Sequence, residues 1–226
     1  MQDNESANGG DSNSLRIAEI VKEFKDGFEF ISSYPKSVTF FGSSQTKPDT
    51  TYYEDAKTLS ARIVKELGYS VLTGGSSGVM EAANKGAFEA GGDSLGLHIK
   101  LPNEQKANHF SRSISFHYFF VRKVCLSFSA EAFVFYPGGY GTMDEFFEIL
   151  TLVQTKKIPE VPIICMGAEY WTDLKEVIKK KLLERGTIQP GDEELFAITD
   201  NHDEILEIIK KAPVRVGLPW NGEHYS

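Results

Sequence analysis

The stretch of the sequence best suited to chemistry is a glycine-rich turn, Pro137-Gly138-Gly139-Tyr140-Gly141-Thr142, between an apolar run and an acidic, helix-periodic segment. A turn of this kind at a helix amino terminus offers unpaired N–H groups and the positive end of the helix dipole. Glycines let an anion approach the backbone, and the Thr142 hydroxyl adds another donor. The turn therefore predicts a phosphate site. The alternative is a purely structural turn that needs positive φ.

Two well-known phosphate-binding sequences do not fit this turn. A dinucleotide fingerprint would need a third glycine where Asp144 stands. The chain also lacks the G-x-x-x-x-G-K-[ST] sequence of P-loop nucleotidases.

Glu145 has two interpretations from the sequence. Thr142-x-x-Glu145 is a capping-box pattern, in which the glutamate only stabilises the start of a helix. A carboxylate one turn beyond a phosphate site would also reach a sugar. Asp144 and Glu148 are supporting acidic residues on the same segment.

Further candidates precede this turn. Arg122 and Lys123 follow an aromatic run, and the arginine offers planar, bidentate recognition of phosphate or ribose oxygens, although such a basic pair is often a solvated helix face. A second strand-to-helix turn contains Gly74 and Gly75, where Ser76 and Ser77 are candidate helix caps.

Strand and helix signals alternate along the chain. Short apolar runs predict strands at 37–42, 69–75, 94–99, 131–136, 161–166 and 195–200, whereas residues 101–118 give no clear pattern. Helical spacing predicts helices at 15–34, 51–67 (with a capping box at Thr51), 79–90, 119–129, 142–155, 171–184 and 202–212. This alternation predicts an α/β fold: a Rossmann-like open parallel sheet with helices on both faces. Ligands bind beyond the carboxyl ends of such strands, which is where Gly42, Gly74-Gly75 and Gly138-Gly139 stand.

Composition sets the remaining limits. The 226 residues carry a formal net charge of -8, which argues against general nucleic-acid binding. We expect a disordered tail at 1–14 and a single domain at 15–226 with an amino-terminal helix. Cys125 and Cys165 lie in apolar segments and read as buried thiols. The five histidines are scattered, so no metal site is predicted; no membrane span is present, and a cytoplasmic location is expected.

Taken together, four motifs resemble the Lonely Guy family: "PGGYGTMDE" (137–145), "RK" (122–123), "GGSSGVMEAANKGA" (74–87) and "FFGSS" (40–44). The resemblance extends from about Lys36 to about Ile209 and is greatest to the longer bacterial branch. It implies a nucleoside 5′-monophosphate phosphoribohydrolase that converts AMP or an N6-modified AMP to free base and ribose 5-phosphate, without a cofactor.

The resemblance also assigns roles to residues. Arg122 and Glu145 would be the catalytic pair, with Lys123 beside them. The loop Pro137-Gly138-Gly139-Tyr140-Gly141-Thr142 would hold the 5′-phosphate. Gly42, Ser43, Ser44, Gly74 and Gly75 would line the nucleotide pocket. A homodimer is expected, in which a partner covers the aromatic residues at 116–120.

This chain departs from the plant-type pattern at Phe120 and Leu126, where those members carry His and Met. The change concerns the base end of the pocket, so the preferred base stays open. A lysine decarboxylase label used within the family is set aside, because no lysine has a recognisable pyridoxal-phosphate context. A non-catalytic nucleotide or molybdenum-cofactor carrier on the same fold is the alternative function.

Overall fold

A computed structural model describes residues 8–100 and 108–214 of the chain. Its centre is one seven-stranded sheet in which every neighbouring pair is parallel. The strands are β1 (Ser37–Phe41), β2 (Ser70–Thr73), β3 (Ser94–Ile99), β4 (Arg112–Phe116), β5 (Ala132–Phe135), β6 (Ile163–Cys165) and β7 (Ala197–Ile198). The α/β fold with an open parallel sheet is therefore confirmed.

The strand order β4-β3-β2-β1-β5-β6-β7 contains one point where the direction of winding reverses, between β1 and β5. Val38 of β1 lies opposite Val71 of β2 on one side and Ala132 of β5 on the other. Loops that leave the carboxyl ends of the two strands at such a point diverge to opposite faces, which opens a crevice above the sheet.

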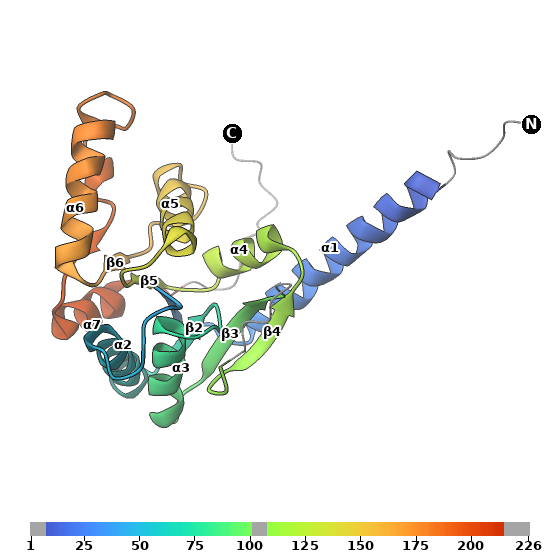
Figure 1. The fold of residues 1–226 in the computed structure, drawn as a ribbon, viewed down its shortest axis with the longest axis horizontal. Helices are drawn as coiled ribbons and strands as arrows, with labels where there is room; N and C mark the ends of the chain where they lie inside the picture. The colour runs from blue at the N-terminus through green and yellow to red at the C-terminus, as the bar shows by residue number, and fades with distance from the viewer. Residues whose placement is uncertain (1–7, 101–107, 215–226) are drawn as a thin grey trace, which may run out of the picture.

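Helices cover both faces of the sheet (Figure 1). On one face lie α2 (Thr51–Arg62, continued by a π-helical turn at Ile63–Leu67), α3 (Val79–Glu89) and α7 (His202–Lys211). On the other face lie α4 (Phe119–Ser127), α5 (Tyr140–Gln154) and α6 (Ala168–Ile178). A second π-helical turn, Lys179–Leu183, continues α6, and a short 3₁₀ helix follows at Asp192–Glu194.

Alternation along the strands produces two apolar cores. On β5, Phe133 and Phe135 belong to the core under α4, α5 and α6, whereas Ala132 and Val134 belong to the core under α2, α3 and α7. Because both faces are covered, the strands read as continuous apolar runs, which explains why the sequence located them well.

The amino-terminal helix α1 (Asn8–Ser32) begins seven residues earlier than predicted. Part of the segment expected to be a disordered tail is therefore helical, and residues 1–7 lie outside the described residues. The first half of α1 projects away from the body and its second half packs against α4 and β4 (Figure 1). Once a helix has started, each further residue adds a hydrogen bond without needing burial.

β4 was not predicted. It forms the edge of the sheet, and Arg112, Ser113 and Ser115 on it are exposed while Phe116 is buried. A short edge strand needs few apolar residues, so this pattern is weak in the sequence. The capping-box prediction at Thr51 was wrong: Thr51 is the first helical residue, and the N-cap, Thr50, makes no side-chain capping bond.

Both cysteines are buried and unpaired, as the sequence indicated. Within residues 8–100 and 108–214, no helix is long and apolar enough to cross a membrane.

Candidate active site

Three turns meet above the carboxyl ends of β1, β2 and β5 and enclose a cavity of about 360 Å³. Ten of the residues predicted for the site line it: Gly42, Ser43, Ser44, Gly74, Arg122, Gly139, Tyr140, Gly141, Thr142 and Glu145. The cavity lies at the β1–β5 reversal, the place where the fold class predicts a ligand.

The turn after β1 is held by backbone contacts on both sides. Ser43 N–H donates to the Pro137 carbonyl at 3.1 Å, and Val79 N–H at the start of α3 donates to the Ser43 carbonyl at 3.1 Å. Gly42 makes the approach of α3 possible, because a β-carbon there would lie 2.8 Å from the Val79 side chain. The first turn is thus tied to both of the other turns.

The glycine loop leads straight into α5. Gly139 is the N-cap and Tyr140 the first helical residue, so the N–H groups of this first turn have no partner within the helix, and Gly139–Thr142 line the cavity. A β-carbon on Gly139 or Gly141 would meet nothing within 4 Å. A side chain of α6 also holds the loop, since the Tyr170 hydroxyl donates to the Gly138 carbonyl at 2.7 Å. A fixed loop with open space in front of its N–H groups suits a phosphate.

Glu145 is not part of a capping box. Gly139, not Thr142, caps α5, and no side-chain capping bond is present, so Glu145 lies beyond the first turn of the helix. Its side chain is only 9% exposed, and its Oε2 atom is buried without a hydrogen-bond partner among the described residues. The structural interpretation of Glu145 left open by the sequence is therefore wrong.

Arg122 faces Glu145 across the cavity from α4. Its Nε–H donates to the Leu97 carbonyl at the end of β3 at 2.7 Å, and its Nη1 atom lies 3.7 Å from Glu145 Oε1. Gly74 leaves room for the guanidinium, because a β-carbon there would lie 2.4 Å from Arg122 Nη2. One edge of the guanidinium is thus anchored to the sheet while the other edge remains near the carboxylate.

Burial dominates the electrostatics of this pair. Burial raises the pKa of Glu145 to about 7, while Arg122 opposes that rise. Burial also lowers the pKa of Arg122, an effect that Glu145 opposes. A carboxyl group that titrates near neutrality beside a fixed guanidinium is the kind of group that performs acid–base or charge-stabilising work.

The family model described as possible lysine decarboxylase, which represents the Lonely Guy family, matches residues 80–209, more than half of the chain. The chain belongs to the Lonely Guy family. The matched segment includes the Gly139 loop, Arg122 and Glu145.

Curated members of the Lonely Guy family align with most of this chain. The cytokinin riboside 5′-monophosphate phosphoribohydrolase LOG5 of Arabidopsis thaliana is 26% identical over 83% of this chain and 82% of its own length. LOG3 of the same plant, with the same activity in its name, is 27% identical over 85% of this chain and 92% of its own.

A solved structure shares the fold. The molybdenum cofactor carrier protein of Chlamydomonas reinhardtii superposes with a TM-score of 0.58 at 22% identity, over 78% of this chain and 97% of its own. At that identity the match shows the fold alone.

Lys123, which the Lonely Guy motifs assign to the site, is not part of the cavity wall. Lys123 Nζ binds Asp144 Oδ2 at 2.8 Å and Glu148 Oε2 at 3.3 Å, which ties α4 to α5. Ser77, predicted as a cap of α3, instead donates its hydroxyl to the Ser44 carbonyl at 2.9 Å, and Gly78 is the N-cap.

Three other predicted residues, Gly75, Pro137 and Gly138, shape the turns without lining the cavity. The contacts of Pro137 and Gly138 are those to Ser43 and Tyr170 given above. Gly75 is packed under the His98 ring, where a β-carbon would lie 2.4 Å from the imidazole.

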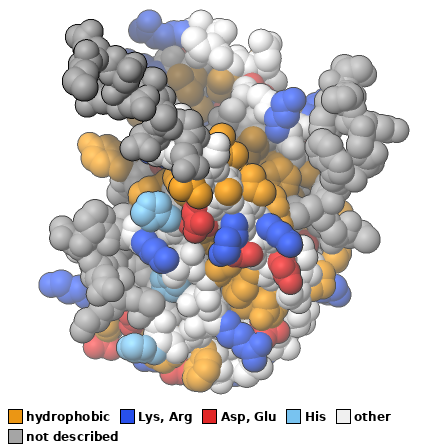
Figure 2. Space-filling view, turned by 90° about the vertical axis from the view of Figure 1, so that its right-hand side faces the viewer, with side chains coloured by type: hydrophobic (Ala, Val, Ile, Leu, Met, Phe, Trp, Pro, Cys, Tyr) orange, Lys and Arg blue, Asp and Glu red, His pale blue; other side chains and the backbone are white. Residues whose placement is uncertain are grey.

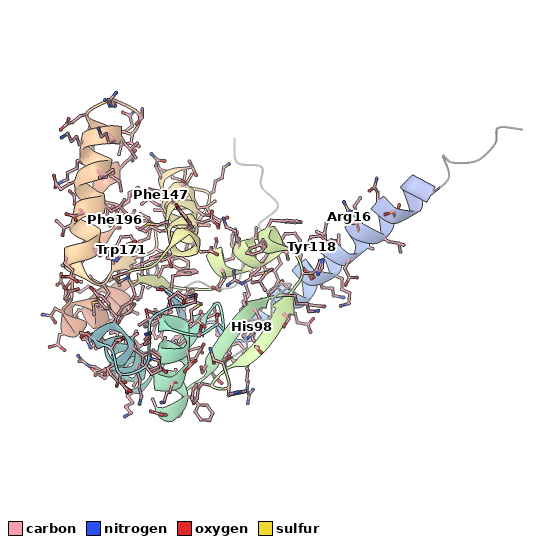
Figure 3. All side chains as sticks on the ribbon, viewed as in Figure 1. Arg16, His98, Tyr118, Phe147, Trp171 and Phe196 are labelled. Carbon is pink, nitrogen blue, oxygen red and sulfur yellow. The ribbon has the colours of Figure 1, made fainter. Side chains whose placement is uncertain are left out.

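Sequence reasoning missed several residues that line this cavity, among them His98 and Met80. His98 stands near the end of β3, and burial together with Arg122 lowers its pKa (Figure 3). Its position in a strand, two residues after Gly96, was a usable signal, because strand ends carry functional side chains in this fold class.

Sequence reasoning also missed a buried amide network beneath the second turn. Asn84 accepts from the Thr73 hydroxyl at 2.6 Å and from Asn108 Nδ2 at 2.9 Å, and it donates to the Leu95 carbonyl at 3.0 Å. Asn108 N–H in turn donates to the Gly75 carbonyl at 3.1 Å. One polar residue within the alanine-rich face of α3 was the available signal, since buried amides need partners.

Across residues 8–100 and 108–214, no group of three His, Cys, Asp or Glu side chains is placed to hold a metal ion.

Proposed function

We propose that the protein hydrolyses the N-glycosidic bond of a nucleoside 5′-monophosphate, AMP or an N6-modified AMP, and releases the free base and ribose 5-phosphate. One observation carries the proposal: a buried carboxyl group, Glu145, stands 3.7 Å from the guanidinium of Arg122 beside a loop suited to phosphate. The named activity of the curated relatives supports it.

The 5′-phosphate would occupy the loop at Gly139–Thr142. The backbone N–H groups of the first turn of α5 and the helix dipole would stabilise its charge. Ser43 and Ser44 lie on the facing turn and supply hydroxyl groups to the same cavity. With the phosphate held there, the ribose would lie beside Glu145, the next polar group along the helix.

Glu145 would stabilise the reacting sugar. Cleavage of an N-glycosidic bond passes through an oxocarbenium-like state, in which positive charge develops on the ribose as the bond to the base breaks. A carboxylate held in a buried site stabilises that charge more strongly than it would in water. A water molecule then bonds to the anomeric carbon, its proton is lost, and the departing base gains a proton.

Arg122 would orient the reactants. Its anchored Nε leaves the two terminal nitrogens to bind ribose or phosphate oxygens, and its charge keeps part of the Glu145 population ionised near neutral pH. The reaction needs water but no redox cofactor, and we propose that it proceeds without an added metal ion.

A carrier function is the second candidate, because a molybdenum cofactor carrier shares the fold. A carrier needs the glycine loop but has no need for a carboxyl group with a raised pKa. The Arg122–Glu145 pair therefore favours the hydrolase.

Assembly and location are also proposals. Phe119 and Phe120 on α4 are 55% and 50% exposed, and Leu15, Ile17 and Val21 on α1 are exposed as well. The view from the side to which α1 projects shows hydrophobic side chains among charged ones (Figure 2). A second copy of the chain would cover such residues in a homodimer, for which light scattering at micromolar concentration is the test. We propose a cytoplasmic location.

The deciding experiment is an incubation with nucleoside monophosphates and the matching nucleosides, with and without a metal chelator. We expect free adenine and ribose 5-phosphate from AMP at equal rates with and without chelator, and a much slower reaction with adenosine. Equal rates with AMP and adenosine would refute the phosphate anchor. Tight nucleotide binding without release of base would favour the carrier.

A further inference from the structure

We propose that α1 belongs to the catalytic scaffold, with Glu23 as a positioning residue that holds α4 and, through it, Arg122. The inference rests on the hydrolase function proposed above. No motif of the glycine turns includes Glu23, and α1 lies outside the segment matched by the family model.

Glu23 binds the backbone at the point where α4 begins. One carboxylate oxygen accepts from His117 N–H at 2.6 Å and the other from Tyr118 N–H at 3.1 Å. Tyr118 is the N-cap of α4 and lies where this helix meets α1 (Figure 3). A carboxylate at the start of a helix satisfies N–H groups and complements the positive end of its dipole.

A second contact fixes the same two helices. Gly27, one turn beyond Glu23, brings α1 so close that a β-carbon there would lie 2.6 Å from Cys125 Sγ and 3.0 Å from the Phe116 ring. Cys125 follows Arg122 by one turn of α4 and is fully buried. Glu23 and Gly27 therefore hold α4 on both sides of Arg122.

The position of Arg122 is sensitive to this support. Arg122 belongs to α4, a helix of only nine residues. Its Nε atom lies 2.7 Å from the Leu97 carbonyl oxygen, and its Nη1 atom lies 3.7 Å from Glu145 Oε1. A shift of α4 by a fraction of an ångström would alter both contacts, and catalytic groups lose activity when displaced on that scale.

The test compares Glu23→Gln with wild type and with Glu29→Gln, a matched control on an exposed position of α1. Glutamine keeps the shape but presents one acceptor and one donor group to the two backbone N–H groups. We expect kcat for AMP to fall about tenfold with a smaller change in KM, since the loss is in orientation. Glu23→Asp, which keeps both acceptor oxygens, should recover part of the rate.

A second readout reports on Arg122 directly. Arg122 and Lys123 face Glu145 from α4 and lower its pKa, whereas Asp144 and Glu148 on α5 raise it. If Glu23→Gln displaces α4, the pKa of Glu145 should rise. A carbon-13 NMR titration of the glutamate carboxyl groups measures this without any turnover.

The outcomes distinguish the positioning role of Glu23 from the proposed hydrolase function. An upward shift of the Glu145 titration in Glu23→Gln and in Gly27→Ala, absent in Glu29→Gln, supports the positioning role even if wild type proves inactive on every nucleotide. An unshifted titration and unchanged kcat, with only a lower melting temperature, overturns it and leaves α1 as a stabilising element.

Discussion

Glu145→Gln replaces a buried carboxyl group by a neutral amide of nearly the same shape. The amide resembles the protonated acid, so the folded structure and the neighbouring Arg122 meet the same neutral group that they meet in wild type below pH 7. The phosphate loop is untouched, and nucleotide affinity should persist. Any difference between variant and wild type therefore reports on the carboxylate alone.

The substitution should stabilise the protein at high pH. The pKa of Glu145 rises from 4.5 to about 7 on folding, which is worth about 3 kcal/mol once the group is ionised in both states. A raised pKa favours the folded state below the unfolded value, and this benefit is lost as pH increases through 7. We expect Glu145→Gln to exceed wild type in unfolding free energy by about 1 kcal/mol at pH 5 and about 3 kcal/mol at pH 9.

The same substitution should abolish most turnover. If the carboxylate stabilises charge on the ribose, kcat should fall by about 10²-fold or more, equivalent to about 2.7 kcal/mol. In wild type, kcat/KM should decrease as pH falls through about 7, because protonation removes the carboxylate.

Urea unfolding at pH 5 and pH 9 and AMP turnover provide the measurements. Glu160→Gln is the control, because Glu160 is exposed and is not part of the cavity wall. Near-normal turnover in Glu145→Gln would refute the catalytic role of the carboxylate. A stability difference that does not grow with pH would refute the raised pKa of Glu145.

Three further substitutions test the cavity. Gly139→Ala meets open space at φ -91°, so the melting temperature should hold while a methyl group in the anion site raises KM for AMP by about tenfold; steady-state kinetics measures this. Gly74→Ala places a methyl group 2.4 Å from Arg122 Nη2 and should lower kcat more than it raises KM, and equal changes in both would contradict this. Tyr170→Phe removes the 2.7 Å bond to the Gly138 carbonyl and should cost about 1 kcal/mol of stability in thermal melts, with a modestly higher KM.

The sequence by itself determined the architecture and the place of the site. Strands such as β1 and β5 are covered on both faces, so they appear as continuous apolar runs between amphipathic helices. Gly42 and Gly74 directly follow β1 and β2, and Gly138 comes three residues after the end of β5. Parallel strands bring their carboxyl ends to one edge of the sheet. The apolar runs and the glycines after them are local features of the sequence, so they predict the fold and the place of the site without the tertiary structure.

Only the tertiary structure decided what the side chains at that edge do. Thr142-x-x-Glu145 has the local pattern of a capping box, and only the start of α5 at Tyr140 rules that out. The raised pKa of Glu145 depends on burial by other elements, and the anchor of Arg122 on Leu97 joins α4 to β3. The support of α4 by Glu23 joins helices that are distant in the chain. Burial and long-range contacts arise only when distant segments pack together, so they cannot be predicted from the spacing of residues along the chain.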